Sequence, residues 1–161
     1  MLMKASCRWT TSSYELAEMT LLMLDTNIIS DMMRNAQGPA ARRVIDITAG
    51  NPLALFRTSV IVDCELRYGL ARKPQARLLA AYERTMATLT VLSLEPDAAV
   101  TYALLRQRLT ASGIGLDAND TLIAAHALTV NATLVSADEA FARVPGLQVE
   151  NWLAHGSSPN V

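Results

Sequence analysis

Cysteine is scarce in this chain of 161 residues, and neither sign of charge is in excess. Cys7 and Cys64 are the only cysteines, and no C-x-x-C pair or Cys/His cluster is present. A disulfide framework and a zinc site are therefore excluded, and a reducing, cytoplasmic location is expected. Fourteen Lys and Arg against fifteen Asp and Glu give a formal net charge of −1. That total by itself indicates neither a nucleic-acid binder nor an acidic tail.

Several familiar functional segments are also missing. The longest uncharged stretch, residues 121–137, contains His126, Asn131 and three threonines and is too short and polar to span a bilayer, so no membrane contact is expected. Residues 1–18 do not have the pattern of a signal peptide. The phosphate-loop, G-x-G-x-x-G, H-E-x-x-H and G-x-S-x-G motifs are absent, which removes the nucleotide-binding and hydrolase classes that depend on them.

What remains is a chain with 51% apolar residues, enough for one packed domain. Short apolar runs alternate with helical patterns, which predicts an α/β fold with a parallel sheet of four to five short strands flanked by helices. We expect the domain to span residues 19–154, with residues 1–18 as an N-terminal extension and residues 155–161 as a flexible tail. The expected strands are 20–24, 53–56, 91–94, 133–135 and 147–149, and the expected helices are 28–33, 40–49, 60–68, 76–88, 96–112 and 118–130.

Four carboxylates stand out by their positions. Asp25 follows an apolar run, and Asp138 is the last residue of the turn 136–138, which follows another apolar run. Glu65 and Asp120 belong to helices whose neighbouring positions are apolar, where an acid is costly unless it is compensated. The carboxyl ends of parallel strands form the ligand edge of such a sheet, so these acids can meet there. Oxygen-only ligands favour Mg²⁺ or Mn²⁺ over Zn²⁺.

Each acid also has an ordinary structural interpretation. Asp25 can cap the helix that follows it, Glu65 can be a solvated helix residue, and Asp138 can belong to a turn or cap. Asp117 and Asn119 compete with Asp120 for the third position, although Asp117 is favoured as a cap.

Other reactive or charged residues have less specific interpretations. His126 lies almost opposite Asp120 on its helix and is expected in the core or on the surface, and Cys64 is expected to fill apolar space. Several cations are either solvated helix faces or contacts for phosphate or a partner. They are Arg42, Arg43, Arg67, Arg72, Lys73 and Arg77.

Four segments in matching order resemble the PIN-domain family, and the last resembles the VapC toxins of bacterial type II toxin–antitoxin systems. These segments are LDTNIIS at 24–30, ELRYG at 65–69 with SVI at 59–61 before it, ND at 119–120 with LIAAHA after it, and ATLVSAD at 132–138 followed by 141–152. Two departures are Asp63, where the family has an apolar or small residue, and the leader before Met19, which leaves Met19 or Met23 as possible starts.

The resemblance implies an acidic pocket that binds Mg²⁺ or Mn²⁺ and cleaves RNA, often transfer RNA, to leave a 5′-phosphate and a 3′-hydroxyl. It implies a cognate antitoxin as partner and a homodimer. Carried over by position, the catalytic and metal-binding acids are Asp25, Glu65, Asp120 and Asp138, and the site-organising residues are Thr26, Asn27 and Ser136.

Two other functions are open at this point. The first is a catalytically silent PIN-like module that binds RNA or protein. The second is an aspartate phosphotransferase of the haloacid dehalogenase kind, which needs a second Asp where Asn27 stands. The charge distribution favours the ribonuclease, because residues 34–108 contain eleven Lys and Arg against six Asp and Glu.

Overall fold

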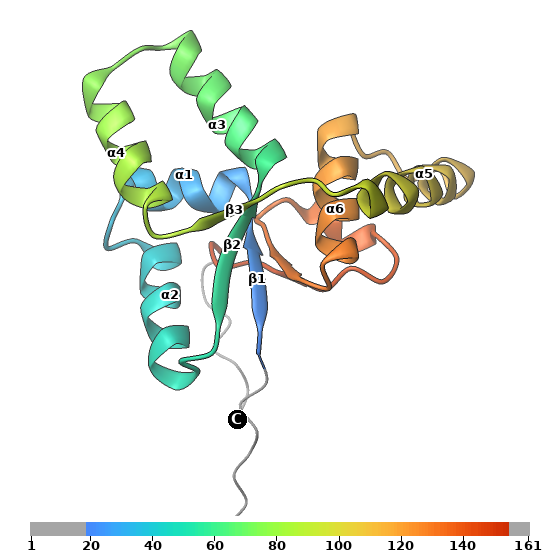
Figure 1. Ribbon diagram of the computed structural model, residues 1–161, viewed down its shortest axis with the longest axis horizontal. Coiled ribbons are helices and arrows are strands. Elements are labelled where there is room, and N and C mark those ends of the chain that lie inside the picture. The colour runs from blue at the N-terminus through green and yellow to red at the C-terminus, as the bar shows by residue number, and fades with distance from the viewer. Residues whose placement is uncertain (1–18, 155–161) are drawn as a thin grey trace, which may run out of the picture.

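The computed structural model describes residues 19–154, and its strands form one five-stranded sheet in the order β3-β2-β1-β4-β5 (Figure 1). Every neighbouring pair is parallel. The carboxyl ends therefore all lie at one edge, which confirms the predicted α/β fold. The strands are β1 (Leu21–Leu24), β2 (Leu55–Ser59), β3 (Thr90–Leu92), β4 (Thr133–Val135) and β5 (Val149–Glu150).

Six helices and one 3₁₀ turn connect the strands. The first four helices contact one another, and the last two pack together on the other side of the central strands (Figure 1). They are α1 (Thr26–Arg34), α2 (Pro39–Gly50), α3 (Val60–Arg72), α4 (Ala76–Met86), α5 (Pro96–Ala111), α6 (Ala118–Thr129) and the 3₁₀ turn η1 (Glu139–Arg143).

Side-chain caps mark the N-terminal ends of α1, α3 and α6. Asp25, Ser59 and Asp117 each accept a backbone N–H from the first turn of α1, α3 and α6. Each cap satisfies an amide that the helix itself leaves unpaired. The capping role predicted for Asp117 is confirmed, and Ser59 caps α3 in the same way.

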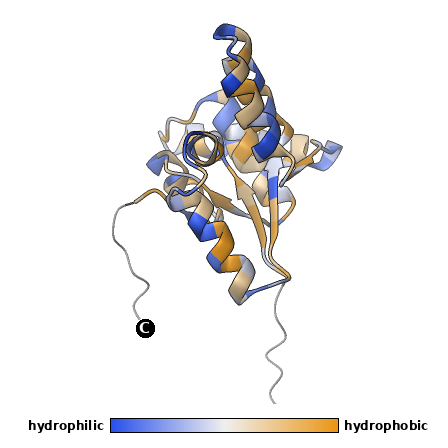
Figure 2. Cartoon of the chain, turned by 90° about the vertical axis from the view of Figure 1, so that its left-hand side faces the viewer, coloured by the Kyte–Doolittle hydropathy of each residue, from blue (hydrophilic) through white to orange (hydrophobic). Residues whose placement is uncertain are grey.

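The core is centred on β1, because this strand has neighbours on both sides and helices on both faces. Leu22, Met23 and Leu24 are buried, as are Leu134 and Val135 of the adjacent β4. Figure 2 shows the strands in hydrophobic colours while hydrophilic residues are spread over the helices. Burial on both faces explains why β1 appears in the sequence as a continuous apolar run rather than an alternating one.

Some predicted boundaries and one burial prediction are wrong. Strand β2 begins at Leu55 and continues through Arg57 and Thr58, beyond the predicted end at Phe56. Polar residues fit there because the Thr58 hydroxyl donates to the Leu24 carbonyl oxygen at 2.8 Å. Helix α3 continues past Gly69 to Arg72 and stops before Pro74, which disfavours helix at the preceding residue. Cys64 is exposed and fills no apolar space.

Residues 19–154 share this single sheet and its core, as expected for one domain. Within that range, no helix combines the length and the apolar character needed to cross a membrane. The predictions of an N-terminal extension at 1–18 and a flexible tail at 155–161 concern segments outside the described residues.

Candidate active site

Asp25 occupies the centre of the carboxyl edge, directly after β1. It is 4% exposed, and its Oδ1 accepts the N–H of Thr26 at 2.7 Å. Its Oδ2 accepts bonds from Asn27 Nδ2 at 2.8 Å and Ser136 Oγ at 2.7 Å. Burial raises the pKa of Asp25 against the opposing effect of these bonds, and nearby acids raise it further. Asp25 is therefore the cap of α1, and it is also a buried carboxylate of the site whose orientation is fixed by hydrogen bonds.

Asn27 and Ser136 join the ends of the two central strands. The amide Nδ2 of Asn27 donates to Ser136 Oγ at 3.0 Å, and its Oδ1 accepts the N–H of Ala137 at 2.9 Å. Ser136 is 1% exposed and also accepts the N–H of Asp138 at 3.0 Å. This network fixes the orientation of Asp25 and of the turn that leads to Asp138, in the positions predicted for site-organising residues.

Glu65 approaches Asp25 from α3. Thr26 Oγ1 donates to Glu65 Oε2 at 2.5 Å, and Asn119 Nδ2 donates to Glu65 Oε1 at 3.1 Å. The carboxylate is thereby held between the first turn of α1 and the first turn of α6. From the sequence, Asn119 was an alternative to Asp120 for the third position of the site. In the structure its side chain instead binds Glu65.

Asp120 lies in the first turn of α6, where its own N–H donates to Asp117 Oδ1 at 2.8 Å. Burial raises the pKa of Asp120 to about 6, and the charges of four other acids contribute to the rise. Three of those four are Asp25, Asp138 and Glu65. A carboxylate affected by all three lies in the same electrostatic environment, so the structure brings the four predicted acids to one place.

Asp138 is the most exposed of the four acids. Its Oδ1 accepts the N–H of Ala140 at 2.8 Å, which caps η1, and it contributes to the raised pKa of Asp25 and Asp120. The cap interpretation and the site interpretation are thus compatible for Asp138, as they are for Asp25.

The site is an oxygen-rich edge whose carboxylates are largely engaged by protein donors. Within residues 19–154, no three Asp, Glu, His or Cys side chains lie in position to hold a metal ion as they stand. The donor chemistry nevertheless fits a hard divalent cation, because every candidate ligand is a carboxylate oxygen. Burial raises the pKa of Asp120, and the charges of the neighbouring acids raise it further, a repulsion that a bound cation would offset.

Asp63, two residues before Glu65, faces another environment. Arg67 Nε lies 2.9 Å from Asp63 Oδ2, and the Tyr82 hydroxyl donates to Asp63 Oδ1. Burial and this bond raise the pKa of Tyr82 to about 12. Asp63 therefore points away from the site, as a residue two positions from Glu65 on a helix should, and its partner Tyr82 on α4 had no sequence signal.

His126 links the two helices that carry Glu65 and Asp120. Its ring is 1% exposed, and Nδ1 lies 2.9 Å from the hydroxyl of Ser59, the cap of α3. Burial lowers its pKa, against smaller effects of the Ser93 backbone and Glu95. His126 is therefore a core residue, one of the two alternatives expected, and the sequence did not identify its pairing with Ser59.

Comparison with known proteins identifies a family for this arrangement. The model of the PIN-domain family matches residues 22–147. A curated relative, Ribonuclease VapC2 of Rickettsia felis, is 31% identical over 134 residues, which cover 82% of this chain and 98% of the relative.

Two solved structures share the fold at a similar level. One is the VapBC2 complex of Rickettsia felis bound to a DNA fragment from its promoter, with a TM-score of 0.74 and 30% identity over 83% of this chain and 99% of the matched chain. The other is VapBC-1 of nontypeable Haemophilus influenzae, with a TM-score of 0.74 and 29% identity over 84% of this chain and 100% of the matched chain.

Proposed function

The chain belongs to the PIN-domain family, and we propose that it is the toxin of a type II toxin–antitoxin system, a Mg²⁺-dependent endoribonuclease. One observation carries the proposal. Four acids from separate parts of the chain gather at the carboxyl edge of the sheet, where burial, and after it the charges of the neighbouring acids, raise the pKa of Asp120 to about 6. The names of the relatives, a VapC ribonuclease and VapBC complexes, support the same activity.

The residues that would hold the metal are Asp25, Asp120 and Asp138, with Glu65 beside them. All offer carboxylate oxygens, which suit Mg²⁺ and also Mn²⁺. A bound cation of this kind supplies neutralisation of the phosphodiester charge and eases deprotonation of water. The buried bonds that Ser136 and Asn27 donate to Asp25 hold one ligand in place before substrate arrives.

The side chains themselves orient the hydrolysis of the phosphodiester. Thr26 and Asn119 hold one oxygen each of Glu65, which leaves that carboxylate with lone pairs to orient the attacking water. The same carboxylate would accept the proton of that water, while Asp25, Asp120 and Asp138 would hold the cation. Water attacks phosphorus, the bond from phosphorus to the 3′-oxygen breaks, and the products have a 5′-phosphate and a 3′-hydroxyl.

RNA, and transfer RNA in particular, is the proposed substrate. Among residues 19–154 the only ion pair is Arg67 with Asp63, so the other described Lys and Arg side chains are not neutralised by an acid of the described chain. Phosphates bind cations that are available in this way. Transfer RNA is the substrate class that the resemblance to VapC toxins favours.

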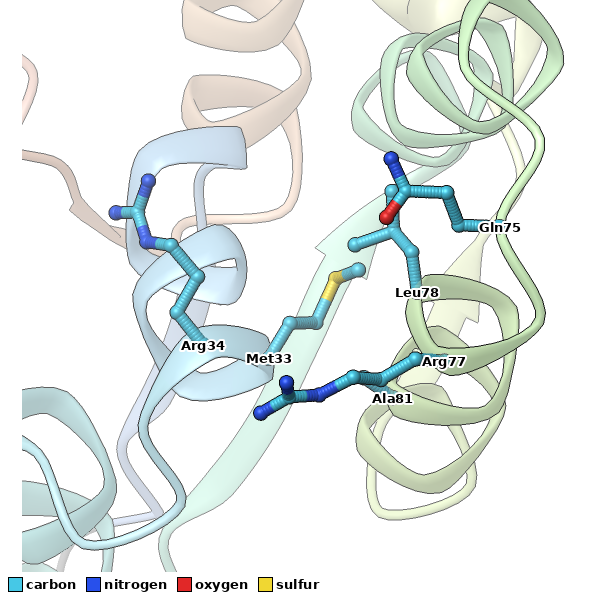
Figure 3. Close-up of a pocket in the computed structure, with 6 residues that line it drawn as sticks. All are labelled: Met33, Arg34, Gln75, Arg77, Leu78 and Ala81. Atoms are coloured by element: carbon cyan, nitrogen blue, oxygen red, sulfur yellow. The ribbon is translucent and has the colours of Figure 1, made fainter.

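A cognate antitoxin is the proposed protein partner, and a groove beside α1 is its proposed docking site. Met33, Leu78 and Ala81 form apolar walls where α1 meets α4, with Arg34 and Arg77 at the rim of a cavity of about 270 Å³. Figure 3 shows Met33 and Leu78 pointing toward one another across this gap and Arg77 reaching toward α1.

The position of this groove links it to the site. Helix α1 begins at Thr26, beside Asp25, and ends at Arg34, about 12 Å farther along its axis. A bound segment that follows α1 would therefore reach the acids, where an inserted Arg could pair with them. A homodimer is also proposed, supported by Val100 and Leu104, two exposed apolar residues one turn apart on α5.

The two rival functions receive less support. Asn27 orients Asp25, Ser136 and Ala137 through its amide, and an amide cannot act as the general acid that the second Asp of a phosphotransferase supplies. A silent binding module has no need for four carboxylates whose charges repel one another.

The experiment that tests the function is cleavage of total transfer RNA by the purified full chain, with Mg²⁺ or with EDTA, followed by mapping of the RNA ends. We expect cuts with 5′-phosphates in Mg²⁺ and none in EDTA. Asp120→Asn should abolish them, and full cleavage by that variant would contradict the assignment. Tight RNA binding without cleavage by the wild type would favour the silent module.

A further inference from the structure

The face of α3 that carries Glu65 continues toward the C-terminal end of the helix. Tyr68 and Arg72 lie three and seven residues after Glu65, spacings that place side chains along one helix face. Their Cα atoms lie about 4.5 and about 10 Å farther along the axis by helical rise. The face thus starts in the acidic site and follows α3 away from the sheet, as Figure 1 shows for the helix.

Tyr68 contributes little to the fold. Its side chain is 66% exposed, whereas Tyr82 on the neighbouring helix is 5% exposed and bonds Asp63. The guanidinium of Arg72 lies over the Tyr68 ring, 5.7 Å from its centroid. The pair is a preformed aromatic and cationic surface that is open to solvent.

The charge of Arg72 is not used inside the described chain. The single ion pair within residues 19–154 joins Arg67 to Asp63, on another side of α3. Arg67 also lies over the Tyr82 ring at 5.3 Å. Of these two arginines on α3, then, Arg67 is committed to a structural cluster and Arg72 remains available to an anion.

Gly69 lies between Glu65 and Arg72 on the same helix face and has no side chain to cover the backbone there. A Cβ built on Gly69 would meet no atom within 4 Å, so packing does not require glycine there. Glycine inside a helix costs about 0.5–1 kcal/mol relative to alanine. The position is therefore open to a ligand that approaches the helix backbone beside Glu65.

We propose that Tyr68, Gly69 and Arg72 form a nucleotide subsite, in which Tyr68 stacks on a base of single-stranded RNA next to the cleaved bond and Arg72 binds a neighbouring phosphate. The subsite rests on the proposed ribonuclease function, because Glu65 defines where the reacting phosphate lies. Bases splayed from loops stack on tyrosine, and arginine pairs with phosphate. Gly69 provides room for the ribose and phosphate between them.

RNA fits this face better than a protein segment does. The surface offers one flat ring and one cation, with a glycine between them instead of an apolar side chain. An apolar protein segment has its own groove on α1 and α4, with Met33 and Leu78 as walls. The face that carries Tyr68, Gly69 and Arg72 therefore offers a ring for a base and a cation for the phosphate next to it.

Binding of a fluorescent single-stranded RNA oligonucleotide, measured by anisotropy, tests the subsite. All proteins carry Asp120→Asn so that no cleavage occurs. We expect Tyr68→Ala to weaken binding about tenfold, as loss of base stacking does, and Tyr68→Phe to bind like the parent. Arg72→Ala should weaken binding and reduce the slope of log affinity against log salt by about 1.

Arg106→Ala is the matched control. Arg106 lies over Tyr102 at 5.6 Å on α5, so it repeats the same pair elsewhere. Thr101, next to Tyr102, bonds Thr129 at the C-terminal end of α6, while Asp120 lies at the other end of that helix. This variant should bind RNA with the affinity and salt slope of the parent.

Cleavage kinetics in proteins with Asp120 intact complete the test. Tyr68→Ala and Arg72→Ala should raise KM more than they lower kcat. If the wild type cleaves RNA while both variants bind and cleave like Arg106→Ala, the subsite is wrong and the ribonuclease stands. If the wild type cleaves no RNA in Mg²⁺, the proposed function fails and the subsite fails with it. A changed oligomeric mass of Tyr68→Ala, with unchanged RNA affinity, would assign the face to a second copy and overturn the proposal.

Discussion

The hydroxyl of Ser136 donates a 2.7 Å hydrogen bond to Oδ2 of Asp25, although 111 residues separate the two in sequence. Both side chains are buried, at 1% and 4% exposure. A bond to the charged form of a buried carboxylate opposes the rise of pKa that burial causes. Ser136 therefore favours the ionised form of Asp25 and fixes the orientation of its carboxylate, without needing to touch a substrate.

Ser136→Ala should reduce RNA cleavage about tenfold, since it removes one donor from a buried carboxylate and raises the pKa of Asp25 further. The loss should be smaller at higher pH, where Asp25 is ionised even without the bond. Cleavage rates at several pH values measure this. Ser112→Ala, at the exposed end of α5, is the control, and an equal loss in both variants would contradict the role of Ser136.

Glu65→Gln should affect activity and Asp63→Asn should affect stability, although the two acids lie two residues apart on α3. Glu65→Gln should lower kcat by about 100-fold or more, because it removes a charge from the site. Asp63→Asn should leave kcat unchanged and lower stability by about 1–3 kcal/mol, because the bonds to Arg67 and Tyr82 are weakened. Single-turnover cleavage and urea unfolding distinguish these outcomes, and a large kcat loss in Asp63→Asn would place Asp63 in the site.

Asp120→Asn should stabilise the metal-free protein at pH 7.5 and have little effect near pH 3.5. The pKa of Asp120 is about 6 in the folded protein against 3.8 ordinarily, so the folded state binds more protons between these values. Its ionised form therefore destabilises the fold above pH 6, and the cost fades as pH falls from 6 to 4. After allowance for screening at a partly exposed group, we expect about 1 kcal/mol, or a few degrees in Tm.

Melting curves in EDTA across this pH range provide the measurement. Added Mg²⁺ should raise the Tm of the wild type more than that of Asp120→Asn, because binding to the folded state stabilises it. Asp97→Asn, at the exposed start of α5, is a suitable control. A pH-independent Tm difference would indicate that Asp120 is not subject to the repulsion described.

Gly69→Ala and Gly113→Ala should change stability in opposite directions. Gly69 is helical with free space around its Cβ position, so alanine should stabilise by about 0.5–1 kcal/mol. Gly113 has φ +67°, which alanine adopts at a cost of about 1–2 kcal/mol. Urea unfolding of both variants tests this, and a destabilised Gly69→Ala would mean that the surface over Gly69 is not open.

Leu78→Asp should abolish stable binding of the proposed cognate antitoxin, because it places a charge in the apolar wall of the groove between α1 and α4. Copurification after joint expression, followed by titration calorimetry, measures the effect. Leu53→Asp makes the same change at an exposed turn before β2 and should retain the complex. Equal binding by both variants would place the antitoxin on another surface.

The fold could be predicted from the sequence because its strands are short apolar runs with polar ends. Burial on both faces of a parallel sheet produces this pattern. Asp25 shows why its site could be located as well: a carboxylate after such a run lies at the ligand edge in this topology. The boundaries of β2 were harder to predict, since Thr58 is buried by a bond to the Leu24 carbonyl that only the folded sheet provides.

The supporting contacts could not be predicted, because they join residues far apart in the chain. Asn119 reaches Glu65 across 54 positions, and His126 reaches Ser59 across 67. Neither residue differs in type or local pattern from an ordinary helical one. Their partners are determined by how α6 packs against α3, which local periodicity does not specify.

The separation of Asp25 from Ser136 and Asp138 has a consequence for biosynthesis. Strand β4 pairs directly with β1, so the centre of the sheet closes only after residue 135 has been made. A nascent chain on the ribosome has Asp25 and Glu65 early but lacks the serine and the last acid. The acidic site is therefore complete only once the segment through Asp138 has been made and β4 has paired with β1.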